Sequence, residues 1–186
     1  MLTRRQKVEG SLFLAGFILC VPAANWLIGH VGTTCVPDGP CLIPVAPGIM
    51  APSGVVMIGL ALVLRDLVQR RLGVSFAVVG ILIGAAISAQ FAPPALVIAS
   101  AVAFLLSEIA DLIVFTPLQK RGLVLAVFVS SIVGLVVDSL LFLWLAFGSL
   151  EFLTGQILGK AWMVLIALPF VHLIRLRDKK LGLEVA

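Results

Sequence analysis

The chain has 186 residues, of which 61% are hydrophobic and only 12% are charged, and its mean hydropathy is +1.22. A soluble domain of this length cannot bury so much apolar surface, so lipid must surround most of the chain. The net charge of +4 does not indicate nucleic-acid binding, because no soluble segment carries a basic face and the positive-inside rule accounts for the charge.

The apolar segments predict an all-α fold. Only helix bundles and closed β-barrels pair every backbone polar group inside a bilayer. The apolar runs do not alternate as barrel strands do, and each is long enough to cross about 30 Å of hydrocarbon as a helix. We therefore expect one polytopic membrane domain over residues 1–186, with six transmembrane helices. The expected spans are residues 11–29, 53–69, 74–91, 95–118, 123–147 and 152–174.

The first apolar run follows three basic residues, as the apolar part of a signal peptide would. Because the run continues to Ile28 and further spans follow, we interpret it as an uncleaved transmembrane helix.

The connection between the first two spans is rich in Gly and Pro and contains Cys35 and Cys41. An extracytoplasmic position would allow these two cysteines to form a disulfide. The last part of the connection, residues 44–54, is either a re-entrant loop that lines a cavity or a surface loop.

The positive charges predict the orientation. With six spans, twelve of the thirteen Lys and Arg residues fall on one side of the membrane, and the opposite loops contain none. Cytoplasmic loops carry the excess of Lys and Arg, so both termini are expected in the cytoplasm. The thirteenth basic residue, Lys160, lies inside the sixth span.

Asp138 in the fifth span and Lys160 in the sixth are expected at the same depth, near the membrane midplane. A short turn at residues 148–151 joins these spans, so they run antiparallel as neighbours. A charge at this depth costs about 2.5–3.5 kcal/mol on insertion scales, which favours an ion pair between the two side chains. The pair either binds a substrate or only holds two helices together, since breaking a buried pair costs about 3–5 kcal/mol in both cases.

Four other charged residues lie in or near the spans. Glu108 and Asp111 are spaced i, i+3 and share one face of the fourth span. Two carboxylates on one face repel each other unless a cation, a proton or a donor-rich ligand lies between them, although Asp111 could instead be hydrated at the inner interface. Arg65 and Asp66 either join this site or belong to the cytoplasmic rim, where Arg side chains extend toward water.

Two amides complete the candidate site. Gln156 lies one turn before Lys160 and shares its face, and Asn25 lies near the outer end of the first span. Both can donate hydrogen bonds to a ligand. The sequence has no P-loop, no His-Glu-x-x-His and no Gly-x-Ser-x-Gly motif, so we do not expect an enzyme. Two neighbouring cysteines without histidines are too few for zinc, and no metal or other cofactor is expected.

The later spans resemble a known family. The stretches that carry the resemblance are Ser-Glu-Ile-Ala-Asp-Leu-Ile-Val-Phe at 107–115, Ser-Ser-Ile-Val-Gly-Leu-Val-Val-Asp-Ser at 130–139 and Gly-Gln-Ile-Leu-Gly-Lys at 155–160. Together with Arg65-Asp66 and the Gly73 that closes the second span, this ordered set resembles the queuosine precursor transporter family, formerly called vitamin uptake transporters.

The resemblance implies a six-helix importer of 7-deazaguanine bases, chiefly 7-cyano-7-deazaguanine, in the bacterial cytoplasmic (inner) membrane. A carboxylate would accept the two donors on one edge of the base, and lysine or amide groups would donate to its carbonyl and nitrile. The substrate-binding residues are then expected to be Asp138, Lys160, Glu108, Asp111, Asp66, Arg65, Gln156 and Asn25. The candidates for stacking on the ring are Trp26, Phe142, Trp144 and Trp162.

Two other interpretations fit the same sequence. One is a substrate-binding subunit of an energy-coupling-factor vitamin importer, which has a similar size and six helices but needs an ATPase partner. The other is a membrane assembly protein whose polar residues only pair helices. The expected partners are the lipid bilayer and a small-molecule substrate, and a homodimer is left open.

Overall fold

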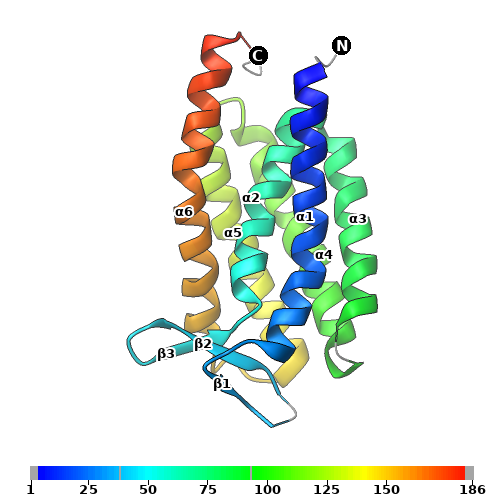
Figure 1. Ribbon diagram of the computed structural model, residues 1–186, viewed down its shortest axis with the longest axis vertical. Coiled ribbons are helices and arrows are strands. Elements are labelled where there is room, and N and C mark those ends of the chain that lie inside the picture. Colours follow the sequence, from blue (N-terminus) through cyan, green and yellow to red (C-terminus); the bar gives the residue numbers. More distant parts are fainter. Residues whose placement is uncertain (1–3, 38, 93, 183–186) are drawn as a thin grey trace.

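The computed structural model describes residues 4–37, 39–92 and 94–182, and Figure 1 shows them as a bundle of helices with a small sheet at one end. The helices are α1 (Arg4–His30), α2 (Val55–Leu72), α3 (Val74–Phe91), α4 (Val97–Leu118), α5 (Leu123–Phe147) and α6 (Leu153–Lys180), with a 3₁₀ turn, η1 (Pro94–Leu96), before α4. The beginning of α1 and the end of α6 lie together at the end of the bundle away from the sheet. We call these two ends the terminal end and the sheet end.

Five of these helices are long and apolar enough to cross a membrane, which indicates a multi-pass helical membrane protein. Within the described residues the exception is α2, which has 18 residues and carries Arg65, Asp66, Arg70 and Arg71. It nevertheless contacts each of the other five helices. Its charges are therefore held by protein contacts rather than by lipid, and hydropathy alone does not reveal its place in the bundle.

Helix boundaries follow the apolar runs in the middle of the chain and exceed them near its ends. The expected spans 74–91 and 123–147 coincide with α3 and α5, whereas α1 begins at Arg4 and α6 continues to Lys180. The extra turns of α1 and α6 consist mostly of polar residues. They can remain helical outside the lipid because the backbone hydrogen bonds of a helix are made within the helix itself. A single residue, Gly73, joins α2 to α3, and its φ of 92° is a conformation that favours glycine.

The connection between α1 and α2 is an antiparallel sheet of three strands, β1 (Thr34–Cys35), β2 (Cys41–Ala46) and β3 (Ile49–Pro52), in the order β1-β2-β3. The expected all-α fold is therefore correct for the bundle and wrong for this connection. A run of prolines and glycines conceals strands this short, because sequence signals for strands need several alternating residues. At its end of the bundle the sheet lies against α1 and α6.

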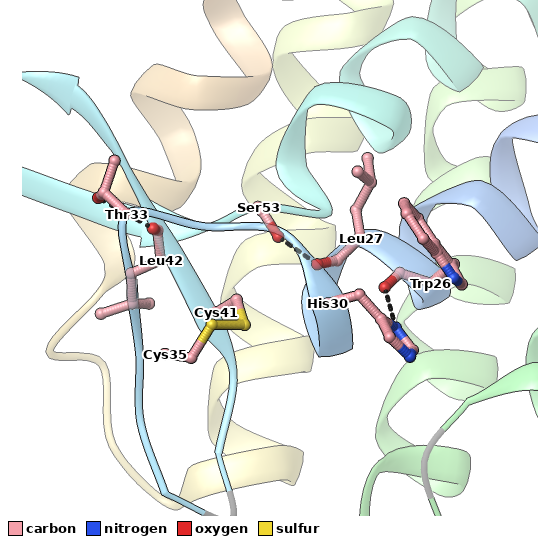
Figure 2. Close-up of a disulfide and its surroundings, with 8 residues drawn as sticks. All are labelled: Trp26, Leu27, His30, Thr33, Cys35, Cys41, Leu42 and Ser53. Carbon is pink, nitrogen blue, oxygen red and sulfur yellow. Dashed lines mark hydrogen bonds between the residues drawn. A yellow bond between two sulfur atoms is a disulfide. The ribbon is translucent and has the colours of Figure 1, made fainter.

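Three bonds fix the sheet. Cys35 and Cys41 form a disulfide between β1 and β2 (Figure 2). The hydroxyl of Ser53 donates a hydrogen bond of 2.7 Å to the carbonyl oxygen of Leu27 in α1, also drawn in Figure 2. On the opposite side, the indole nitrogen of Trp162 in α6 donates to the carbonyl oxygen of Val45 at 3.0 Å. The sheet thus joins the first helix to the last.

Two apolar clusters hold the bundle together. One includes Leu62, Leu135 and Val164 of α2, α5 and α6, all of them fully buried. The other includes Phe17 of α1 and Phe104 of α4, whose rings stack with centroids 5.8 Å apart. A close contact also brings α2 against α6, since a methyl group added at Gly59 would lie 2.6 Å from the carbonyl oxygen of Lys160.

Candidate functional site

Lys160 forms the centre of the first buried polar group, which we call the lysine cluster (Lys160, Asp138, Ser139 and Gln156). Its Nζ lies 2.6 Å from Asp138 Oδ2 and donates to Ser139 Oγ at 2.9 Å and to Gln156 Oε1. The lysine is 1% exposed, and these three acceptors match the three donors of its ammonium group. The expected ion pair between Asp138 and Lys160 is confirmed, because the antiparallel α5 and α6 do place the two residues at one depth.

A cavity of about 50 Å³ adjoins the lysine cluster, in the half of the bundle nearer the sheet. Because a buried water needs about 10–15 Å³ of such space, the cavity has room for several waters or part of a small ligand. Its polar lining residues are Asn25, Ser88, Ser100, Asp138, Gln156 and Lys160. All six helices contribute residues to the cavity wall. The sequence had instead suggested a pocket formed by the last three spans alone.

The apolar part of the wall includes two aromatic rings, Phe104 and Phe142. Of the four aromatic residues proposed to stack on a ligand, only Phe142 lines the cavity. Trp26, Trp144 and Trp162 are 51–63% exposed on the outside of the bundle. Trp26 instead stacks on His30, with ring centroids 5.1 Å apart.

A second buried group, the arginine cluster (Arg65, Asp66, Glu108 and Asp111), joins α2 to α4. The guanidinium of Arg65 pairs with Asp66 Oδ1 at 2.9 Å, with Glu108 Oε2 at 3.2 Å, and with Asp111 Oδ1. All four side chains are at most 1% exposed. Glu108 and Asp111 share one face of α4, as their spacing predicts, and that face is turned toward α2.

The position of Arg65 settles one alternative. The side chains of Arg65 and Asp66 are completely buried, so they are not part of an aqueous rim. Arg65 Nη1 also donates to Gln69 Oε1 at 3.1 Å, and its guanidinium carbon lies 5.7 Å from the centre of the Phe115 ring. Asp66 Oδ2 accepts a hydrogen bond of 2.9 Å from Ser130. Five side chains from α2 and α4 therefore contact the buried guanidinium of Arg65: its three carboxylate partners, Gln69 and Phe115.

The two clusters are neighbours but only one lines the cavity. Asn25, Asp138, Gln156 and Lys160 face the cavity, whereas none of the four arginine-cluster residues does. Ser107 lies between them, with its Oγ 3.5 Å from Asp138 Oδ1, and it precedes Glu108 in α4. The two clusters are thus adjacent along α4, with Ser107 beside Asp138 and Glu108 beside Arg65.

A third group, the end cluster (Glu9, Arg71, Arg177 and Asp178), joins α1, α2 and α6 at the terminal end. Arg71 donates two hydrogen bonds of 2.8 Å to the two carboxylate oxygens of Asp178, which is completely buried. Glu9 Oε2 lies 3.0 Å from Arg71 and 2.7 Å from Arg177. The sequence analysis did not single out Glu9 or Asp178. In the sequence, each is a single acidic residue among basic residues at one end of the chain. Such basic segments are usually explained by the positive-inside rule alone.

The sequence also did not indicate Ser88, Ser100 and Phe104 as cavity residues. Small hydroxyls and phenylalanines are common in transmembrane helices, where they usually only pack. Only the tertiary arrangement shows that these three side chains converge on the space beside Lys160.

The described chain is thus a multi-pass helical bundle with a buried ion pair beside a small, partly polar cavity. Residues 85–174, just under half of the chain, match the family described as "putative vitamin uptake transporter". This match agrees with the resemblance found in the sequence over α4, α5 and most of α6. Comparison with curated proteins and with solved structures found no match.

Proposed function

We propose that the protein imports a 7-deazaguanine base, chiefly 7-cyano-7-deazaguanine, across the bacterial cytoplasmic membrane. The observation that carries this proposal is the cavity beside the Asp138–Lys160 pair, in a chain whose matched segment belongs to a vitamin-uptake type of transporter. An ionised Asp138 offers acceptors for the amine and ring N–H of the base. Gln156 and Asn25 supply amide donors for its carbonyl and nitrile, and Lys160 can supply one only in exchange for one of its three bonds to Asp138, Ser139 or Gln156.

The charge of the site suits a neutral ligand. Lys160 already balances Asp138 at 2.6 Å, so a ligand does not need to bring a charge to compensate either one. The two phenylalanine rings that line the cavity, Phe104 and Phe142, provide apolar surfaces for the faces of a flat ring. A small planar heterocycle therefore fits this wall better than a bulky or strongly charged vitamin.

The proposed orientation has six spans with both termini in the cytoplasm, in a single transporter domain. It places the disulfide on the oxidising side and the arginine-rich end cluster on the cytoplasmic side. With this orientation the cavity lies in the outer half of the bundle, and the end cluster closes the inner half by joining α1, α2 and α6. Import then requires the end cluster to separate after the ligand has bound.

The topology can be tested by cysteine labelling in a variant that lacks the three native cysteines. A cysteine at position 120, between α4 and α5, should react with an impermeant reagent only from the cytoplasmic side. A cysteine at position 149, between α5 and α6, should react only from outside. Labelling of position 120 in intact cells would contradict the proposed orientation.

The substrate can be tested with the purified protein alone. In a thermal-shift screen, 7-cyano-7-deazaguanine should raise the unfolding temperature, whereas guanine should do so less because it lacks the nitrile. Reconstituted vesicles should then exchange labelled for unlabelled base without ATP or a partner protein. Exchange only after addition of an ATPase module would favour the energy-coupling-factor interpretation. A shift with an unrelated vitamin and none with deazaguanines would refute the proposed substrate.

A further inference from the structure

The arginine cluster contains more negative than positive groups. In the part of the chain that the structure describes, Arg65 is the cation within ion-pair distance of Asp66, Glu108 and Asp111. Three ionised carboxylates around one guanidinium would leave uncompensated negative charge in a region excluded from water. Buried groups avoid this cost by taking up protons or by binding a cation.

The position of Asp66 and Asp111 on one guanidinium favours a proton. Arg65 pairs with one carboxylate oxygen of each residue, from α2 and α4, and also with Glu108. The single positive charge balances only one of these carboxylates, so like-charge repulsion favours a proton on one of the two aspartates. Asp111 Oδ2 is buried without a donor among the described residues, since nearby Ser130 donates to Asp66 instead.

A metal ion is the less suitable way to balance the charge. Among the residues described, no group of three His, Cys, Asp or Glu side chains is arranged to hold a metal ion. The guanidinium at the centre of the cluster also repels any cation that approaches the carboxylates.

The charges around the cluster come from specific helices. From α5, Asp138 lies 3.5 Å from Ser107, the residue before Glu108, and its partner Lys160 comes from α6. From α1, the buried Cys20 packs in the same apolar cluster as Phe104 of α4, while α3 contains no ionisable residue. Along α4, the cavity side of the bundle is therefore separated from the cluster only by the step from Ser107 to Glu108, and the positive charges next to these two residues are the paired Lys160 and Arg65.

We infer that Asp66 and Asp111 hold one exchangeable proton, and that this proton is the coupling ion that drives import. This inference rests on the proposed function, because it names the driving force of the same transporter. The proton leaves a water in the cavity and becomes the O–H of one aspartic acid. It then passes to water on the cytoplasmic side when the end cluster separates. A lower pH outside than inside would thus drive the ligand inward.

The first experiment asks whether the proton is present and needs no substrate. Infrared spectra of the purified protein at neutral pH should contain a protonated-carboxyl band. This band should shift when wild-type protein is made with carbon-13 carboxyl-labelled aspartate, and it should be lost in Asp111→Asn or Asp66→Asn. The matched control is Glu151→Gln, which removes an exposed acid far from the cluster and should keep the band. Absence of a labelled aspartic-acid band in the wild type would overturn the inference whatever the substrate is.

The second experiment asks whether the proton drives transport. In proteoliposomes, a gradient of one pH unit should accumulate 7-cyano-7-deazaguanine up to about tenfold, since one proton moved across one pH unit corresponds to about 1.4 kcal/mol. Asp111→Asn should keep equal exchange of labelled for unlabelled base, which also proves that the variant folds, but should lose the accumulation. Glu151→Gln should retain both activities.

The two hypotheses fail in different ways. If the wild type exchanges the base but does not respond to the pH gradient, or responds to a sodium gradient instead, proton coupling is refuted. The proposed substrate is then still supported. No exchange of the deazaguanine refutes the proposed function, and the infrared band then decides whether the aspartates hold the proton.

Discussion

Neutralising the lysine cluster one residue at a time separates a binding role from a structural one. Lys160 is 1% exposed and donates to three acceptors, of which only Asp138 is charged. Asp138→Asn leaves the ammonium group with neutral acceptors in an enclosed site. Removing one partner of a buried ion pair costs about 3–5 kcal/mol, so we expect a large fall in thermal stability. Lys160→Met should cost a similar amount, because it leaves the carboxylate without its cation.

The double variant Asp138→Asn/Lys160→Met is the decisive measurement. It contains no uncompensated charge, and neutral replacements of buried ion pairs are often as stable as the original. We expect its unfolding temperature in detergent to return close to that of the wild type while uptake of 7-cyano-7-deazaguanine stays absent. Uptake is measured in cells that cannot make this base and lack another importer. Normal uptake by the double variant would refute the binding role and leave only a structural pair.

Three further predictions follow from the packing. Gly59→Ala should destabilise the protein by about 1–3 kcal/mol in a thermal unfolding assay, because the new methyl group would meet the backbone of α6. The matched control is Gly29→Ala, which should be neutral because no atom lies within 4 Å of its new methyl group. Cys35→Ser should lower stability by about 2–3 kcal/mol on the chain-entropy model, and titration of the unreduced, denatured wild type should find one free thiol. Asp178→Asn should cost about 3 kcal/mol by leaving the buried Arg71 without its two-bond partner, and an unchanged unfolding temperature would contradict this.

Much of the bundle could be predicted because lipid imposes a simple rule on sequence. Long apolar runs must be helical in a bilayer, and α3 and α5 begin and end where those runs do. The depth argument for Asp138 and Lys160 also worked, since a short turn between antiparallel helices leaves little freedom in their relative depth.

The partners of Arg65 could not be predicted in the same way. Its distance from the end of the second apolar run is compatible both with a side chain extending to water and with burial. Only the packing of α4 against α2, with Glu108 and Asp111 turned inward, decides between the two. The strands of the connection were missed for a different reason, because their pairing depends on the disulfide and on contacts with α1 and α6 rather than on local sequence.

The arrangement of α2 connects the three clusters. Its first turns, at Val55 and Ile58, line the cavity, and its middle holds Arg65 against α4. Its last turn holds Arg71 against α1 and α6. A rigid helix that moves at one of these levels must move at the others, because each contact is made by the same element. In the proposed mechanism, ligand binding beside Lys160, protonation of Asp111 and closure of the terminal end would therefore be coupled through α2 without any contact between ligand and proton.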